Sequence, residues 1–129
     1  LDTNVLIRFL VRDDEQQANL AYNKFKQAEA NQEELFVPIL VTLEVIWVLD
    51  SVYELTRQEI IDVLDKLLLL PILQFEKQST LRNFLSSAQE TNLDLSDLLI
   101  AFSSKESNCS SVITFDKRAS KFEFFELLK

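Results

Sequence analysis

The stretch Leu35–Leu49, LFVPILVTLEVIWVL, decides the fold class of this 129-residue chain. Leu35–Val37 is short, apolar and ended by Pro38, which predicts a buried strand. The residues from Ile39 to Tyr53 are apolar on most faces and numerous enough to form a buried helix. A buried strand that leads directly into a buried helix is typical of α/β proteins.

Helix and strand patterns alternate along the rest of the chain. Apolar residues recur at three- and four-residue steps in the helical stretches, whereas the strands are short apolar runs. We expect helices at Thr3–Val11, after Asp13 through Ala28, after Thr56 through Leu68 and through Leu81–Ala88, and a helix through Leu98–Phe102 that starts at Asp94 or Ser96. We expect strands at Ile72–Phe75, Ser111–Thr114 and Phe124–Leu127. This order predicts one domain, an α/β sandwich with a mainly parallel sheet.

Local sequence also predicts where individual elements begin. Asp13 with Gln16, and Thr56 with Glu59, have the spacing of a capping box, in which each side chain satisfies a backbone N–H of the other. We expect Leu1–Asp2 to be the last residues of a strand that starts upstream of this sequence.

Two residue types that many enzymes use are absent. The chain has no His, which excludes Ser-His-Asp and Cys-His triads and every histidine-ligated metal site. It has no Gly, which excludes the glycine-rich loops that bring the backbone close to a phosphate. Carboxylates, hydroxyls, amines and hard metal ions remain for catalysis.

The sequence predicts a cytoplasmic protein. Cys109 is the only cysteine, so no internal disulfide can form and a reducing setting is expected. The longest apolar runs, such as Leu67–Leu73, are far shorter than the roughly 20 residues of a membrane-spanning helix. No secretory leader opens the sequence, and we expect no membrane association.

Four acidic residues fall where the predicted topology brings strand and helix ends to one edge of the sheet. Asp2 follows the first strand, and Asp116 follows the strand that ends at Thr114 with one residue between them. Asp97 lies in the first turn of its helix, and Glu44 lies one or two turns into the helix after the quoted strand. Ligands bind at this edge of parallel sheets, so we expect the acids to share a site.

Each of these acids also has a structural explanation. Asp97 could be a helix N-terminal acid, and Asp2 and Asp116 could be turn residues. Glu44 is the one charge in the apolar run Val37–Leu49, and a buried unpaired carboxylate is very costly. We therefore expect a cation or a metal ion beside Glu44.

Clustered carboxylates without histidine suit phosphodiester hydrolysis. Mg²⁺ prefers oxygen ligands, activates water and neutralises charge on phosphate oxygens. Thr3, Asn4 and Thr114 lie beside the acids and could orient ligands, although such residues more often cap turns. The net charge of −8 argues against nucleic-acid binding, but less so if some of the acids cluster to hold divalent cations.

Four segments resemble the signature segments of PIN-domain nucleases, and in particular the VapC-type toxins of bacterial toxin–antitoxin pairs. They are Asp2–Leu6, Leu43–Leu49, Asp97–Ala101 and Thr114–Asp116, and they occur in the order of the family. The resemblance implies a three-layer α/β/α sandwich over residues 1–129. It also implies Mg²⁺ or Mn²⁺ bound by the acids, cleavage of single-stranded or structured RNA, a homodimer, and an antitoxin whose tail covers the site.

The same resemblance assigns roles to individual residues. It gives metal-binding and catalytic roles to Asp2, Glu44, Asp97 and Asp116. Asp94 is a nearby acid that we expect to play a supporting part. The chain departs from the family pattern in its short opening strand and in Asn108-Cys109, which stands where relatives commonly carry Gly.

An RNA substrate also needs cations near the acids. Arg8 and Arg12 are four residues apart near the first acid, and Lys117, Arg118 and Lys121 follow the last. We expect Arg8, Arg12, Lys117 and Arg118 to hold the phosphate backbone. The alternative is that these are solvated surface charges with local salt bridges.

The acidic site and an aromatic cluster also indicate contacts with protein partners. An acidic pocket would attract an inserted Arg of the antitoxin, a bidentate partner for carboxylates. The aromatic cluster Phe122, Phe124 and Phe125 fits either a dimer face or the core. A non-catalytic PIN-like module that binds RNA or protein would lack one or more of the acids. The second rival is a phosphotransfer protein, either an aspartyl-phosphate receiver or a haloacid-dehalogenase-type phosphatase, and the latter would need a second Asp where this chain has Asn4. DNA remains open as an alternative substrate.

Overall fold

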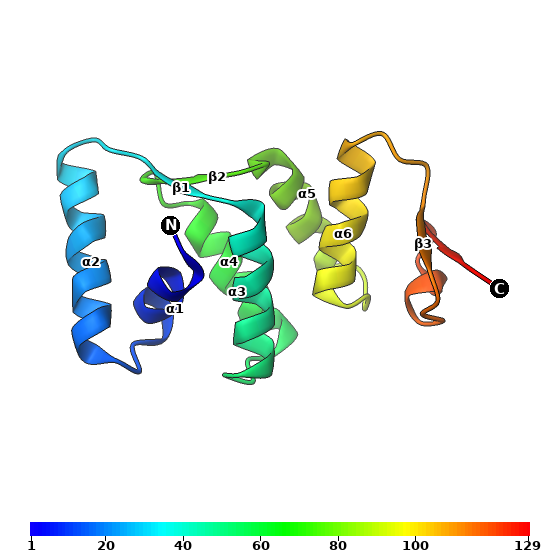
Figure 1. Ribbon diagram of the computed structural model, residues 1–129, viewed down its shortest axis with the longest axis horizontal. Coiled ribbons are helices and arrows are strands. Elements are labelled where there is room, and N and C mark those ends of the chain that lie inside the picture. The colour runs from blue at the N-terminus through cyan, green and yellow to red at the C-terminus, as the bar shows by residue number, and fades with distance from the viewer. The chain divides into compact units, whose positions relative to one another are not determined.

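The computed structural model describes all 129 residues and contains six α-helices, four short strands and one 3-10 helix. The chain divides into two compact units, Leu1–Gln78 and Ser79–Lys129, and each is described by itself. Helices and strands follow one another along the chain (Figure 1), and both strand pairs are parallel. The predicted α/β character and the predicted parallel pairing are confirmed.

The first unit is a pair of strands with four helices. Its elements are α1 (Thr3–Val11), α2 (Glu15–Ala30), β1 (Leu35–Val37), α3 (Ile39–Ser51), α4 (Arg57–Leu68) and β2 (Leu73–Phe75). β1 and β2 pair with Leu35 opposite Leu73 and Val37 opposite Phe75. Helix α1 contacts α2 and α3, and α3 contacts α4. The buried apolar residues include Leu6, Phe25, Val37, Val45, Ile46, Leu49, Ile60, Ile61, Leu64 and Phe75.

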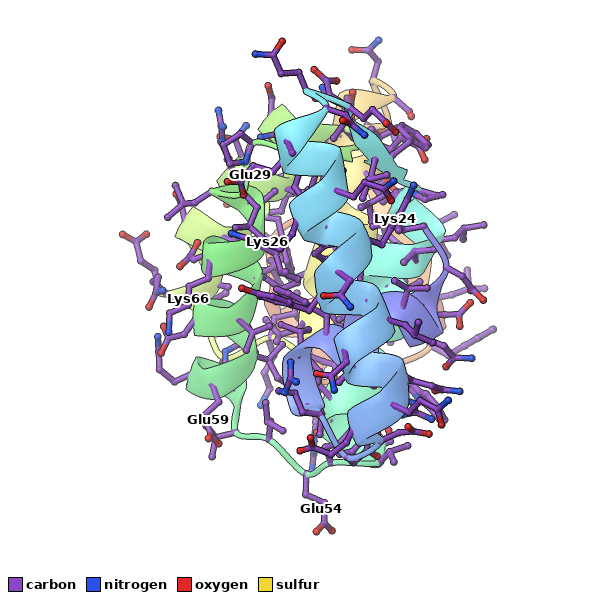
Figure 2. All side chains as sticks on the ribbon, turned by 90° about the vertical axis from the view of Figure 1, so that its left-hand side faces the viewer. Lys24, Lys26, Glu29, Glu54, Glu59 and Lys66 are labelled. Atoms are coloured by element: carbon purple, nitrogen blue, oxygen red, sulfur yellow. The ribbon has the colours of Figure 1, made fainter.

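Charged side chains cover the outer faces of α2 and α4. Lys24, Lys26 and Glu29 on α2 are exposed and extend from the helix into solvent (Figure 2). Glu59 and Lys66 on α4 are exposed in the same way. These two helices therefore have the amphipathic character that their apolar spacing predicts.

The start of α2 differs from the prediction. Asp14, not Asp13, is the N-cap, and its Oδ1 accepts a hydrogen bond from the backbone N–H of Gln17 at 3.0 Å. The carboxylate of Asp13 instead accepts a hydrogen bond from the Tyr53 hydroxyl at 2.7 Å. The expectation for Asp13 was wrong because a residue 40 positions away engages its side chain.

The other capping box is confirmed. The Thr56 Oγ1 accepts a hydrogen bond from the backbone N–H of Glu59 at 3.2 Å, and the Glu59 carboxylate accepts one from the backbone N–H of Thr56 at 2.9 Å. Both orphan donors at the start of α4 are satisfied reciprocally.

Five residues adopt left-handed backbone conformations that glycine usually supplies. They are Arg12, Gln32, Glu54, Lys77 and Asn108, with φ between 55° and 65°. A non-glycine residue in this region costs about 1–2 kcal/mol because its Cβ approaches the following carbonyl oxygen. Asn tolerates the conformation best of these residues, which fits its place at Asn108.

The second unit contains α6 (Leu95–Glu106), β3 (Val112–Thr114), η1 (Ala119–Lys121) and β4 (Phe125–Leu127), preceded by α5 (Gln78–Ala88). β3 and β4 pair with Val112 opposite Phe125 and Thr114 opposite Leu127. Of the aromatic cluster, Phe125 is buried in the core, and Phe122 and Phe124 are partly buried. The buried apolar residues of this unit include Leu81, Phe84, Leu85, Leu98, Leu99, Ala101, Ala119 and Phe125.

Several element boundaries are shifted from the predictions. The strands β2, β3 and β4 each begin one residue later than expected, and α3 ends at Ser51 instead of Tyr53. Leu1 and Asp2 form no strand, but the Leu1 backbone nitrogen donates a hydrogen bond to the Phe36 carbonyl oxygen at 2.6 Å, which places these residues beside β1. None of the helices has the length and apolar character that crossing a membrane requires.

Candidate active site

Asp2 lies at the junction between the start of the chain and α1. It is exposed, has extended backbone angles and serves as the N-cap, with its Oδ1 accepting a hydrogen bond from the Thr3 backbone N–H at 2.7 Å. Thr3 is buried, and its hydroxyl has no hydrogen-bond partner. Asn4 is exposed. The hydrogen bond between Leu1 and the Phe36 carbonyl places Asp2 close to β1, the strand that leads into α3.

Glu44 lies in the second turn of α3 and is exposed. This corrects the expectation that Glu44 is a buried charge. The core of the helix is formed by Val41, Val45 and Leu49, so the opposite side of α3 carries Glu44. The same exposed side carries Trp47, which is 60% exposed. The case for Glu44 as a functional residue therefore no longer rests on the cost of burying a carboxylate.

Glu76 is an acid that the sequence analysis missed. It directly follows β2, and its Oε1 accepts a hydrogen bond from the backbone N–H of Ile39 at 2.9 Å. Its own backbone N–H donates to the Val37 carbonyl at 2.9 Å. Pro38 supplies no side-chain cap for α3. Glu76, which follows the neighbouring strand β2, instead caps the helix that carries Glu44. The sequence clue was an acid placed directly after a strand.

In the second unit, Asp94 and Asp97 lie together at the start of α6. The Asp94 Oδ1 accepts hydrogen bonds from the backbone N–H groups of Ser96 at 3.0 Å and of Asp97 at 3.3 Å. Asp94 is therefore the N-cap of α6, one of the two starts expected, and its carboxylate is committed to the helix end. Asp97 lies in the first turn, where the helix dipole favours an acid.

Asp116 is held in a tight loop after β3. Its backbone N–H donates to the Thr114 Oγ1 at 2.9 Å, and its Oδ1 accepts a hydrogen bond from the Arg118 backbone N–H at 2.8 Å. The Ala119 N–H donates to the same oxygen at 3.4 Å. The role of Thr114 in this unit is therefore to fix the loop that carries Asp116.

The fold also changes the ionisation of Asp97. Partial burial, and then the negative charges of Asp94 and Asp116, raise the pKa of the Asp97 carboxyl above its ordinary value. Mutual repulsion of this kind is relieved by a nearby cation. Of the four predicted site residues, the second unit thus brings Asp97 and Asp116 within electrostatic reach of each other, and Asp94 with them.

The acids of the second unit meet the chemical requirements for a hard divalent ion. In neither unit do three Asp, Glu or Cys side chains converge closely enough to hold a metal ion by themselves. Mg²⁺, however, is commonly held by one or two carboxylates together with water and substrate phosphates. Asp97 and Asp116 offer carboxylate oxygens of this type.

The predicted phosphate-binding cations have different surroundings in the two units. Arg8 donates hydrogen bonds to Gln17 and Tyr53 and forms an ion pair with Asp13 at 3.1 Å, and Arg12 donates to Asn19 at 2.8 Å. Lys117, Arg118 and Lys121 are exposed, and no ion pair involves them. The three cations after Asp116 are therefore available to a ligand.

The negative charge of the chain is concentrated in the first unit. Leu1–Gln78 contains seven Lys and Arg against fourteen Asp and Glu, which gives a net charge of −7. Ser79–Lys129 contains six against seven, which gives −1. The argument against a nucleic-acid ligand from the total of −8 therefore applies mainly to the first unit.

Comparison with known proteins bears on the whole chain. The family model of the PIN domain matches residues 1–124. The VapC ribonuclease of Aquifex aeolicus (strain VF5) is 26% identical over 124 residues, which cover 96% of this chain and 91% of the relative. No solved structure gave a significant match. The α/β architecture, the order of the four acidic segments and this match over nearly the full length agree, and the chain belongs to the PIN domain family.

Proposed function

We propose that this protein is a divalent-metal-dependent endoribonuclease that hydrolyses RNA phosphodiester bonds and acts as the toxin of a bacterial toxin–antitoxin pair. Its membership of the PIN domain family and its similarity to a VapC ribonuclease support a nuclease. The observation that carries the proposal is Asp97, a half-buried carboxylate placed beside two further carboxylates with no ion pair to compensate them.

Metal binding and catalysis are assigned to Asp2, Glu44, Asp97 and Asp116. Thr3, Asn4, Thr114 and Asp94 support them, and residues 1–129 act as one domain. A bound Mg²⁺ or Mn²⁺ would supply an activated water at neutral pH and neutralise charge on the phosphate.

The residues of the second unit have separate tasks. Asp94 caps α6 and so fixes the turn that carries Asp97. Thr114 and the backbone N–H of Arg118 orient Asp116 from both sides. Because the pKa of Asp97 is raised, Asp97 retains its proton at higher pH than an ordinary aspartate, and binding of a cation releases that proton.

Substrate is held by cations beside these acids. Lys117 and Arg118 are exposed, lie directly after Asp116 and have no ion-pair partner, so RNA phosphates would be their counterions. Arg8 and Arg12 stay in the proposal as further phosphate contacts, but RNA would compete with their present hydrogen bonds.

An assay of metal-dependent cleavage tests the proposal. Purified protein is incubated with RNA in Mg²⁺ or Mn²⁺, and Asp97→Asn should lower kcat/KM by about 100-fold or more, because a metal-binding carboxylate is removed. EDTA should abolish cleavage in the wild type. Asp65→Asn is the matched control, since Asp65 is an exposed acid on α4, and it should cleave like the wild type. Cleavage that persists in EDTA or in Asp97→Asn would contradict the proposal.

We also expect two protein partners, an antitoxin and a second copy of the chain. An antitoxin that inserts an Arg among the acids would form bidentate contacts and displace the ion. We expect the protein to work as a homodimer in the cytoplasm. Co-purification with the product of the adjacent gene would test the antitoxin, and light scattering would test the homodimer.

A further inference from the structure

Helix α3 differs from the other capped helices in the origin of its N-terminal cap. The residue before each of α1, α2, α4 and α6 supplies a side-chain oxygen to a backbone N–H of the first turn, and these residues are Asp2, Asp14, Thr56 and Asp94. Pro38 stands in that place before α3 and supplies none, and the first turn of α3 contains no acid. The start of α3 therefore depends on a group from another element.

Glu76 supplies that group from the end of β2. Its Oε1 accepts a hydrogen bond from the Ile39 N–H at 2.9 Å, and its backbone N–H donates to the Val37 carbonyl oxygen at 2.9 Å. The two bonds hold the chain on both sides of Pro38, where β1 ends and α3 begins. The carboxylate bond is charge-assisted and hence roughly twice as strong as a neutral one, and Glu76 is half-buried. Glu76 therefore restrains the direction in which α3 leaves the strand.

The junction that Glu76 holds connects the two predicted metal-binding acids of the first unit. Glu44 lies in the second turn of α3, directly after the turn that Glu76 caps. On β1, the Phe36 carbonyl oxygen accepts the hydrogen bond of the Leu1 backbone nitrogen, next to Asp2. Asp2 is thus tied to β1 and Glu44 to α3. The turn between β1 and α3 sets the position of one acid relative to the other.

We propose that Glu76 is a positioning residue for metal binding, because its cap fixes Glu44 relative to Asp2 and so raises the affinity of the protein for Mg²⁺ or Mn²⁺. This inference rests on the proposed metal-dependent function and adds to it a residue that binds no metal itself. Uncapped helix ends fray, and an ion that meets a frayed turn must order the Glu44 carboxylate as it binds. Groups that orient metal ligands commonly change metal affinity by about 10- to 100-fold.

The first test measures binding of Mn²⁺ alone, without RNA. The ion should quench the fluorescence of Trp47, which is the single tryptophan and lies one turn after Glu44 on the same exposed side of α3. Glu76→Ala removes the acceptor and should raise the Kd of Mn²⁺ by about 10-fold. Glu76→Gln keeps an acceptor oxygen but loses the charge, and it should retain most of the wild-type affinity. An equal loss in both variants would show that the charge matters and not the cap, and it would overturn the proposal.

Glu59 provides the matched control, because it caps a helix that carries none of the predicted metal ligands. It lies on α4 (Figure 2), and its carboxylate accepts a hydrogen bond from the Thr56 N–H at 2.9 Å, the length of the Glu76 bond. Glu59→Ala and Glu76→Ala should each lower Tm by roughly 2–6 °C, as the loss of a helix cap predicts. Mn²⁺ binding should weaken in Glu76→Ala and stay unchanged in Glu59→Ala. A lowered Tm with wild-type Kd in Glu76→Ala would mean that Glu76 only stabilises the fold.

The second test separates metal affinity from the rate of cleavage. At limiting Mn²⁺, Glu76→Ala should cleave RNA more slowly than the wild type, and saturating Mn²⁺ should restore its kcat. Asp97→Asn should not be restored in this way, since it lacks a proposed ligand. A kcat of Glu76→Ala that stays low at saturating Mn²⁺ would contradict a role in positioning alone.

The proposed function can fail separately from this inference. A wild type that neither binds Mn²⁺ nor cleaves RNA would overturn both, before any variant is compared. A wild type that binds Mn²⁺ and cleaves RNA, together with unchanged Mn²⁺ affinity in Glu76→Ala, would overturn the positioning role and leave the nuclease standing.

Discussion

At the scale of single residues, Asp13 and Tyr53 show how one hydrogen bond couples two titrations. The hydrogen bond from the Tyr53 hydroxyl, with the charge of Arg8 as a further cause, lowers the pKa of Asp13, and the same hydrogen bond raises the pKa of Tyr53. An acid whose pKa is lowered by folding stabilises the fold at pH values above its unfolded-state pKa. This stabilisation is lost as the pH falls through the folded-state pKa. A tyrosine whose pKa is raised by folding stabilises the fold at pH values below its unfolded-state pKa. That stabilisation is lost as the pH rises through the folded-state pKa.

Tyr53→Phe should therefore lower Tm most between about pH 5 and pH 9, with the difference from the wild type shrinking at both extremes. Thermal unfolding followed by circular dichroism across this range measures it. The chain has two tyrosines, so Tyr22→Phe leaves Tyr53 as the one phenol, and its absorbance should titrate above the usual value near 10. Titration at or below that value would show that the hydrogen bond is not formed.

Glu44 shows the limit of prediction at this scale. The run around it is apolar on nearly every face, so the sequence does not tell which side of the helix is buried. The packing of α3 against α1 and α4 decides that choice, and it leaves Glu44 exposed. The position of Glu44 in the chain was predictable, but its burial was not.

At the scale of elements, Lys105 joins α6 to the segment that ends the chain. Its ammonium lies 4.9 Å from the ring centroid of Phe102, 5.7 Å from that of Phe122 and 5.0 Å from that of Phe124. Phe122 in turn packs edge-on against the buried Phe125 at 6.3 Å between centroids. Cation–π contacts at exposed sites contribute roughly 0.5–1 kcal/mol each and are not additive.

Lys105→Met should therefore lower the free energy of unfolding by about 1 kcal/mol, because the side chain keeps its length but loses its charge. Lys105→Arg should retain most of the stability, since a guanidinium also binds aromatic faces. Chemical denaturation measures both, with Lys121→Met as a control in which no ring contact is removed. Equal stability of Lys105→Met and the wild type would mean that apolar packing alone holds this segment.

The elements themselves were largely predictable because their determinants are local. Thr56 and Glu59 lie within one turn, and the structure forms the capping box they predict. The N-cap of α2 was predicted at Asp13 instead of Asp14 because either aspartate can cap a helix. The choice between them depends on the hydrogen bond of Tyr53 to Asp13. Glu76 was missed for the same reason, since it caps a helix that starts 37 residues earlier. Long-range hydrogen bonds leave no pattern in a single sequence.

At the scale of the whole molecule, the fold class and the family were predictable, and the joint site of the four acids stays a prediction. The alternation of helices with short apolar strands predicted the α/β class, and the order of the acidic segments predicted the PIN domain family. The charges of all residues are known from the sequence, but the net charge of each unit can be assigned only after the structure has defined the units. Within the second unit, Asp97 and Asp116 are 19 positions apart and became neighbours only through the packing of α6 with β3.

The stability of the whole molecule should therefore respond to pH and to Mg²⁺ through Asp97. A carboxyl whose folded pKa is raised contributes stability that is present below its unfolded-state pKa and is lost as the pH rises through the folded value. Without metal, the Tm of the wild type should consequently fall relative to that of Asp97→Asn as the pH rises from about 4 toward neutrality. Mg²⁺ should restore the loss in the wild type, and more so at higher pH, because the ion binds the ionised carboxylate. Asp65→Asn controls for the general effect of removing one charge from a chain of net charge −8. Parallel Tm curves for the wild type and Asp97→Asn, with or without Mg²⁺, would show that the carboxylates at the start of α6 and after β3 neither repel one another nor bind the ion.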